Sequence, residues 1–233
     1  MSVTARTWRA PLARLGAELA VIVLGVLIAL WADGWVAERR DRAVERSRIE
    51  ALMDNVAATR ERLRAAQELA RSAREALTLI VYWEHAEEVG RHQDLISSGL
   101  LFGPVFTPEI NVYADLKNSG DLALLRSADL RQALARMDAT FEELDLLQAD
   151  LTMVQQLNFD PFLLREFPLA GTLGPFLGLE GLPADAVATD FDLRLIRNLA
   201  LFKLDLIAQV LAGYDDAFDV LRLVEAALLD ASD

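Results

Sequence analysis

The sequence contains no cysteine and few residues that break helices. Without cysteine the chain has no disulfide bond, thiolate metal site or thiol nucleophile. Only seven prolines and twelve glycines occur, and they gather mainly in two short regions, 102–110 and 167–188. Aromatic residues make up 7% of the chain, while alanine and leucine are abundant, which favours helix over strand. We therefore expect an all-α fold built from long helices.

Basic residues are scarce in most of the chain. Residues 1–75 carry thirteen arginines and ten acids, a charge of +3, whereas residues 76–233 carry ten basic and twenty-six acidic residues, a charge of -16. Nucleic-acid binding needs a basic face, so we expect no nucleic-acid partner. The acids either solvate helix surfaces, hold the body off an anionic membrane or attract a basic partner protein.

One long hydrophobic run lies near the start of the chain. Between Arg14 and Asp33 stand eighteen residues that carry a single charge, that of Glu18. As a helix they would span roughly 27 Å, close to the thickness of the hydrocarbon core of a bilayer. The sequence thus predicts an N-terminal transmembrane anchor at 15–35, preceded by a basic head at 1–14.

The ends of the run also fit a membrane boundary. Trp31 and Trp35 stand where an aromatic belt would lie, and the long side chain of Arg14 can extend toward the headgroups at the other end. Ala32 and Gly34 form a small-residue pair that could be a signal-peptide cleavage site. The run is therefore either an uncleaved signal anchor, which we favour, or a removable signal peptide.

Small residues mark one face of the predicted anchor helix. Glu18, Gly25, Ala29 and Ala32 stand at i, i+7, i+11 and i+14. Small side chains let membrane helices approach closely, and a carboxyl group on the same face should point to protein rather than lipid. Glu18 is therefore either a partner contact or ion relay, or it pairs with Arg14 one turn earlier.

Three segments resemble one protein family. They are GAELAVIVLGVLIALWADGWVAERRDR in and after the anchor, VYADLKNSGDLALLRSADLRQAL at 112–134, and RNLALFKLDLI near the C-terminus. They are similar to a family of uncharacterised bacterial single-pass membrane proteins with a Gly-Glu anchor, a Trp- and Arg-rich exit and a Tyr, Leu, Ser-Gly, Leu, Leu-Arg pattern. The resemblance covers most of the chain and implies this architecture, but the family has no assigned reaction. Ala17 between Gly16 and Glu18 is a small departure from the family pattern.

This resemblance implies a bacterial inner membrane, and the arginines bear on orientation. Five arginines follow the anchor and three precede it, which favours a cytoplasmic body. A short basic head before a single anchor, however, generally leads to export of the C-terminal part of a chain. We expect a single-pass protein with a periplasmic body, and the cytoplasmic orientation remains the alternative.

Beyond the anchor, no proline occurs between residues 12 and 103, so the helix should continue as a stalk at 36–80. Hydrophobic residues recur along the stalk at alternating spacings of three and four, which is a heptad seam. Alanines at its middle indicate close packing against another helix, in the same chain or in a second copy. The seam consists of Ile49, Leu52, Val56, Thr59, Leu63, Ala66, Ala70, Ala73, Leu77 and Ile80.

Both histidines lie between residues 82 and 101. On a helix, His85, Glu88 and His92 would share a face at i, i+3 and i+7, and imidazole with carboxylate can ligate zinc or iron. The spacing is not the HExxH of metalloproteases and no fourth ligand is indicated. A solvated surface cluster is the better interpretation, with these three residues as weak metal candidates.

The rest of the chain, 81–233, is predicted to be an acidic helical bundle. Thr107 and Pro108 should start a short helix that ends at Gly120. Ser127 should cap a long helix to about residue 166. Its apolar stripe reads Leu130, Leu134, Met137, Phe141, Leu144, Leu147, Leu151 and Val154.

Two further breaks are expected in the bundle. Asp160-Pro161 should kink or interrupt the helix that Ser127 starts, because proline removes a hydrogen bond. Thr189 or Asp190 should cap a final helix to about residue 229. The stripe of that helix is predicted at Leu195, Leu199, Phe202, Leu206, Val210, Gly213, Ala217, Val220, Val224 and Ala227.

The segment 167–188 holds four glycines and three prolines among leucines and phenylalanines, so regular helix is not expected there. An apolar loop of this kind either folds over the end of the bundle as a lid or is exposed as a contact for a partner or a membrane. The candidate partner contacts are Phe167, Leu173, Phe176 and Leu177.

Several function classes can be weighed on this basis. No nucleophile and base pair, metal constellation or phosphate-binding loop stands out, so we expect no catalytic residue and no cofactor. The leading hypothesis is a membrane-anchored helical scaffold or accessory subunit that contacts another membrane protein or a second copy of itself. The alternative is a sensor or signalling ectodomain coupled through the transmembrane helix, and a metal-dependent enzyme is less favoured.

Overall fold

The computed structural model of the chain shows helices and no strand among the residues that it describes, so the predicted all-α fold is confirmed. The chain forms two compact units, Met1–Ile49 and Glu50–Asp233. The described residues are 9–85, 92–101, 103–167, 169–179 and 192–232, without the side chains of 9–22, 93, 171–172 and 175–176.

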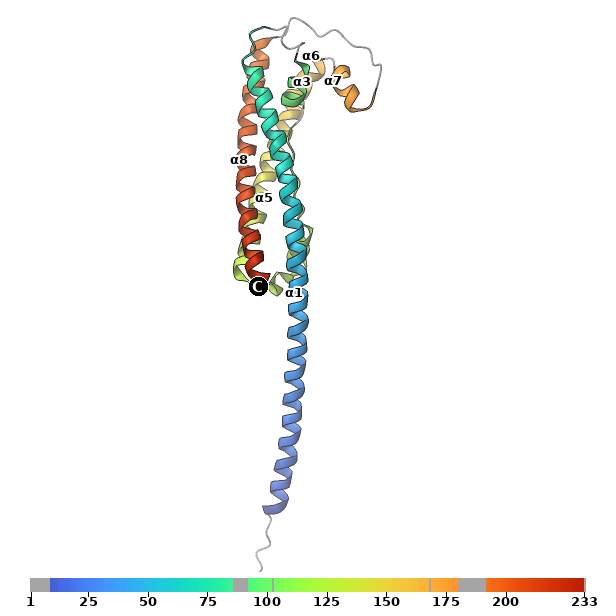
Figure 1. The fold of residues 1–233 in the computed structure, drawn as a ribbon, viewed down its shortest axis with the longest axis vertical. Coiled ribbons are helices and arrows are strands. Elements are labelled where there is room, and N and C mark those ends of the chain that lie inside the picture. The colour runs from blue at the N-terminus through green and yellow to red at the C-terminus, as the bar shows by residue number, and fades with distance from the viewer. Residues whose placement is uncertain (1–8, 86–91, 102, 168, 180–191, 233) are drawn as a thin grey trace, which may run out of the picture. The chain divides into compact units, whose positions relative to one another are not determined.

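The longest helix, α1, runs from Arg9 to Val81 and contains 73 residues (Figure 1). Alanine, leucine, glutamate and arginine dominate its sequence, and no proline follows Pro11, which together account for its length. The helix therefore continues without a break through the segment 36–80.

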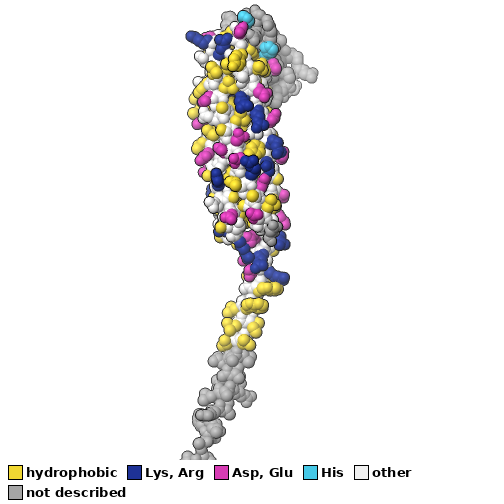
Figure 2. Space-filling view, turned by 60° about the vertical axis from the view of Figure 1, so that its left-hand side comes forward, with side chains coloured by type: hydrophobic (Ala, Val, Ile, Leu, Met, Phe, Trp, Pro, Cys, Tyr) yellow, Lys and Arg dark blue, Asp and Glu magenta, His cyan; other side chains and the backbone are white. Residues whose placement is uncertain are grey.

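The N-terminal unit exposes its large apolar side chains from Val23 to Val36. Their exposed fractions run from 49% at Val23 to 73% at Trp31, and Figure 2 shows a hydrophobic group next to the part of the chain drawn in grey. Among the described residues, no helix combines the length and the apolar character that crossing a membrane requires. The described side chains begin at Val23, so residues 15–22 of the expected anchor lie outside them.

The second unit contains three long helices side by side: the part of α1 from Glu50 onward, α5 (Ala128–Val154) and α8 (Leu193–Ser232) (Figure 1). Each residue of the heptad seam is buried, with exposed fractions from 0% to 4%. The seam is thus covered within one chain. Side-chain bonds between α1 and α8 run beside it, from Arg60 to Glu225 at 2.7 Å and from Gln67 to Asp215 at 2.7 Å.

Shorter helices connect these three. The chain passes through α3 (Gln93–Ile96), the π-helical turn η1 (Ser97–Leu101), α4 (Asn111–Ser119) and the 3-10 turn η2 (Asp121–Leu124) before α5. After α5 come the π-helical turn η3 (Gln155–Phe159), α6 (Asp160–Glu166) and α7 (Leu169–Phe176).

Two of the predicted helix ends are confirmed. The Ser127 hydroxyl accepts a hydrogen bond from the backbone N–H of Leu130 at 3.1 Å, which satisfies one of the free donors at the start of α5. Gly120 ends α4 with a φ of 80°, in the left-handed region that favours glycine.

The start of α4 differs from the prediction. The helix begins at Asn111, so Thr107 and Pro108 do not start it. Side chains of other helices instead hold the backbone of the preceding segment: the Thr59 hydroxyl accepts from the N–H of Glu109 at 2.9 Å. Because those bonds satisfy the backbone, the segment has no need to form a helical turn there.

The break at Asp160-Pro161 is confirmed, and it takes the form of a π-helical turn. Proline has no N–H to donate and would clash with the turn before it. In the π-helical turn η3 each hydrogen bond spans one residue more than in an α-helix, and α6 then begins at Asp160 and continues to Glu166. The long helix from Ser127 therefore changes geometry twice without ending.

The apolar segment 167–188 contains a helix, α7, so the expectation of no regular helix was wrong for Leu169–Phe176. Glycine lowers helix propensity by only about 1 kcal/mol per residue, which tertiary packing overrides. Gly178 comes after α7 with a φ of 68°. Residues 180–188 lie outside the described part of the chain.

The final helix begins later than expected and turns a different face inward over its first half. Thr189 and Asp190 lie outside the described residues, and the carboxylate of Asp192 caps α8 by accepting from the N–H of Arg194 at 3.0 Å and of Leu195 at 3.1 Å. From Val210 on, the predicted stripe is mostly buried. In the first half the buried residues are instead Ile196, Ala200, Lys203 and Ile207.

Candidate functional site

The weak metal candidates are not brought together on a helix. His85 and His92 are exposed and both lie outside helices, and Glu88 lies outside the described residues. The ring of His92 stacks on Trp83, with centroids 6.3 Å apart. Across the described part of the chain, no group of three or more metal-ligating side chains is placed to hold an ion.

The predicted membrane-interface residues are described in part. The side chains of Arg14 and Glu18 lie outside the described ones. Trp31 is 73% exposed, and Trp35, 49% exposed, lies under the Arg39 guanidinium at 4.3 Å from the ring centroid. This cation–π contact gives the tryptophan a charged neighbour at the end of the apolar run.

The predicted small-residue face stays open. A Cβ placed on Gly25 would meet nothing within 4 Å. Ala29 and Ala32 are exposed. The packing of a second helix on this face stays a prediction.

The candidate contacts in the apolar segment do not share one environment. Phe167 is buried and meets the ring of Phe162 edge-on at 5.7 Å between centroids. Leu173 is half-buried, Leu177 is 62% exposed, and the side chain of Phe176 lies outside the described ones. Phe167 is therefore part of the core, and Leu177 is available as a surface contact.

Sequence reasoning missed the most unusual polar group of the core. Lys203 on α8 is fully buried, with an exposed fraction of 0%. Its ammonium donates to the carbonyl oxygen of Leu100 at 2.8 Å and to the amide oxygen of Gln155 at 2.7 Å. The Gln155 amide nitrogen donates in turn to Leu100 O at 3.1 Å and to Asp160 at 2.7 Å. Lysine, glutamine and carboxylate thus form one network.

This network joins the two π-helical turns. Leu100 belongs to η1 and Gln155 to η3, and the ring of Phe159, also in η3, lies 5.2 Å from the Lys203 ammonium. Burial lowers the pKa of Lys203 to about 7, and the nearby charge of Asp160 opposes that shift. An ammonium that titrates near neutral pH therefore holds together two unusual turns.

Comparison of the chain with protein-family models, with curated proteins and with solved structures finds no match. The resemblance to a family of bacterial single-pass membrane proteins therefore stays a prediction.

A second buried polar group fixes the segment between η1 and α4. The side-chain amide of Gln148 on α5 accepts from the N–H of Phe106 and donates to the carbonyl oxygen of Phe106 at 3.1 Å. The Tyr214 hydroxyl reaches the same amide at 3.4 Å, and burial raises the pKa of Tyr214. Gln148 thus pairs both backbone hydrogen-bonding groups of Phe106, a residue that lies outside the helices.

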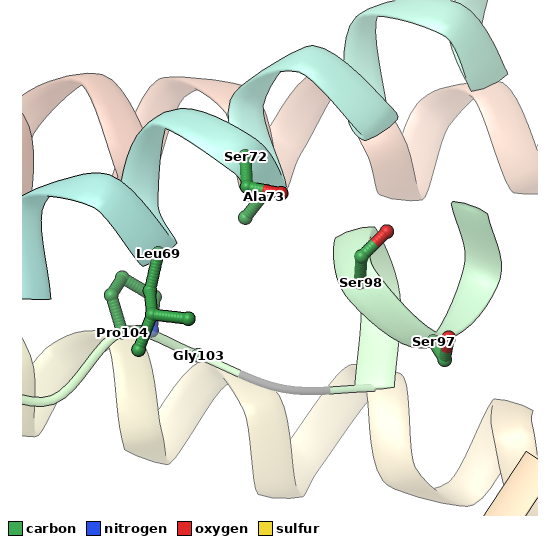
Figure 3. Close-up of a pocket in the computed structure, with 7 residues that line it drawn as sticks. All are labelled: Leu69, Ser72, Ala73, Ser97, Ser98, Gly103 and Pro104. Carbon is green, nitrogen blue, oxygen red and sulfur yellow. The ribbon is translucent and has the colours of Figure 1, made fainter. Parts of the chain in front are cut away.

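Beside this segment lies a cavity of about 310 Å³. Figure 3 shows it between α1, η1 and the chain at Gly103 and Pro104. Its hydroxyl groups are engaged in part, because Ser97 and Ser98 both donate to the carbonyl oxygen of Asp94 at 2.8 Å. The described residues that line it are apolar or carry hydroxyl groups, and none of them is ionisable.

Proposed function

We propose that the protein is a membrane-anchored helical scaffold or accessory subunit that acts by contacts with other proteins. The observation that carries this proposal is the exposure of large apolar side chains over more than half of the circumference of α1 in the N-terminal unit, while Gly25, Ala29 and Ala32 line the remaining face there. The large side chains stand at adjacent positions and not on a single stripe, and they are Val23, Leu24, Val26, Leu27, Ile28, Leu30 and Trp31.

A helix that is apolar on all sides is stable when it is buried, in a large protein core or in lipid. Each valine, leucine or isoleucine that leaves water gains about 1.5–3 kcal/mol. Six such residues close together, with Trp31 beside them, therefore favour transfer into a bilayer. The charges after them also fit a membrane exit, since Arg39 covers Trp35 and Arg42 pairs with Glu38 at 2.6 Å.

The buried polar groups of the acidic second unit serve its own fold. The seam of α1 closes its core, and both Lys203 and Gln148 are buried inside it. The surface of this unit is therefore the part that we propose makes contacts with other proteins. We place this unit on the periplasmic side of a bacterial inner membrane, with the cytoplasmic side as the alternative. A sensor coupled through α1 is the second candidate, because that helix runs unbroken through both units.

Purification of the full chain in a mild detergent distinguishes these functions. A partner protein in fixed stoichiometry supports the scaffold, and chemical cross-linking before lysis shows whether the contact existed in the membrane. A bound small molecule without a partner would favour the sensor. Zinc or iron bound in a stoichiometric amount, and lost in a His85→Ala, His92→Ala variant, would instead revive a metal-dependent enzyme.

A further inference from the structure

The helices α5 and α8 pack against each other, and the line along which their outer sides meet is called the groove below. The two helices approach closely where Gly213 of α8 lies opposite α5: a Cβ on that glycine would stand 3.0 Å from Leu144 and 3.3 Å from Leu147. Beside this point is a hollow of about 400 Å³. Its walls include Arg136, Thr140 and Glu143 from α5 and Asp216, Asp219 and Leu223 from α8.

Exposed apolar side chains continue along both walls. On α5, Leu146 follows Glu143 by three positions and Met153 follows by seven more, so all three share a face; Leu146 is 68% and Met153 53% exposed. On α8, Leu223 is 47% exposed and Phe202 46%. A helical spacing of three and four connects Phe202 to Leu223 through Asp205, Gln209, Ala212, Asp216 and Asp219.

The charges on this face are predominantly acidic. No lysine or arginine occurs between Arg136 and Arg165, so the wall from α5 offers Glu143 and Asp150 without a basic neighbour on that stretch. The wall from α8 adds Asp205, Asp216 and Asp219, of which Asp219 accepts from Arg222. The groove therefore has apolar side chains along its length and carboxylates beside them.

We propose that this groove binds a basic amphipathic helix of a partner protein. The inference rests on the scaffold function and names its contact surface. A helix laid between α5 and α8 buries its apolar stripe against Leu146, Met153 and Leu223, while lysines or arginines on its flanks meet the carboxylates of both walls.

The negative charge of the second unit favours a basic helix, and not a second copy of the chain, as the molecule that binds in the groove. The second unit carries fifteen basic and thirty-one acidic residues, a charge of -16. Two such faces would bring carboxylates together, and like charges brought face to face cost several kcal/mol. A basic helix removes that repulsion and gains attraction, which also makes its binding sensitive to salt.

A synthetic helix tests the groove directly. The probe is a 21-residue peptide with a leucine heptad stripe and lysines on the flanks, and its matched control has glutamates in place of the lysines. Both are titrated into the full chain in lipid nanodiscs at two salt concentrations. We expect the lysine peptide to bind at least ten-fold more tightly than the glutamate peptide, with a lower affinity at high salt.

Matched variants separate a specific groove from general attraction to an acidic protein. Glu143→Lys with Asp216→Lys should weaken binding at least ten-fold, while Glu68→Lys with Glu75→Lys, the same change of charge on α1, should leave it nearly unchanged. Leu146→Ser should weaken binding several-fold and the similarly exposed Leu69→Ser should not. Equal losses of affinity in the two charge variants would overturn the proposal that the groove is the binding site. Circular dichroism checks that each variant is folded.

The proposal can be tested in cells by replacing Leu223, or Leu69 as the control, with a photo-reactive amino acid that cross-links to its neighbours. We expect cross-links from position 223 to a basic helical segment of another protein, and none from position 69. Cross-links from 223 to another copy of this chain would overturn the inference. Cross-links to a partner from 69 but not 223 would also overturn it, yet they would leave the scaffold function standing.

Discussion

The ammonium group of Lys203 lies 2.8 Å from the carbonyl oxygen of Leu100, a residue 103 positions earlier in the chain. The same oxygen accepts from Gln155, so a single carbonyl at the end of η1 receives donors from both α8 and η3. Buried acceptors and donors must be paired, and here the pairing ties three distant segments to one point. The first two predictions concern this point.

Replacing Lys203 tests how much the network stabilises the second unit. Lys203→Met keeps most of the apolar volume but leaves the Gln155 amide oxygen without its lysine donor, so we expect a loss of ~1–3 kcal/mol. Lys203→Ala adds a cavity and should cost more. Thermal unfolding followed by circular dichroism measures both, and a Lys203→Ala variant as stable as the native chain would show that the network contributes nothing.

The pH dependence of stability has a definite sign. Burial lowers the pKa of Lys203 in the folded chain to about 7, below the usual lysine value of 10.5. Between these values the unfolded chain holds a proton that the folded chain lacks, so the free energy of unfolding should rise with pH, by up to ~1.4 kcal/mol per unit. Below pH 7 both states are protonated and this contribution to the slope disappears.

The comparison should cover pH 7 to 9.5, because the raised pKa of Tyr214 reverses the trend once the unfolded tyrosine ionises above pH 10. Lys203→Met should lack the rise that the native chain shows. Parallel curves for the two proteins would contradict the assigned role of the lysine.

The hydrogen bonds of Gln148 lead to a separate prediction about the segment between η1 and α4. Gln148→Leu leaves the N–H and the carbonyl of Phe106 buried and unpaired, which should cost ~2–4 kcal/mol. The rate of hydrogen exchange at the Phe106 amide should rise by the factor that corresponds to this loss of free energy, about tenfold for each 1.4 kcal/mol. Gln156→Leu, a change at an exposed position about two turns further along the chain, is the control and should leave that exchange rate unchanged.

The sequence predicted the helices well and the buried polar groups poorly, for one physical reason. Hydrophobic periodicity locates a buried face only where that face is apolar, as it is along the seam of α1. On α8 the centre of the first half is Lys203, so the leucines beside it defined a stripe one position away, and Leu195 and Phe202 prove exposed. On α5, Gln148 is buried where Leu147 was expected for the same reason.

A further prediction concerns Ser127, whose role as the N-cap of α5 was predicted from the sequence and is confirmed. Ser127→Ala removes the acceptor for the N–H of Leu130 and should destabilise the second unit by ~1 kcal/mol. Ser127→Asp supplies an equivalent acceptor beside the positive end of the helix dipole and should be nearly neutral. Chemical denaturation of both variants measures this, and equal effects of alanine and aspartate would mean that the cap is unimportant.

The central claim is that the apolar segment at 15–35 remains in the mature protein and resides in lipid. Its most direct test is alkaline carbonate extraction of membranes from cells that express the full chain, followed by N-terminal sequencing of the protein in the pellet. The account predicts that the intact chain stays in the pellet, whereas a variant without residues 15–35 is released. Recovery of the intact chain in the supernatant, or a mature N-terminus after Gly34, would contradict it.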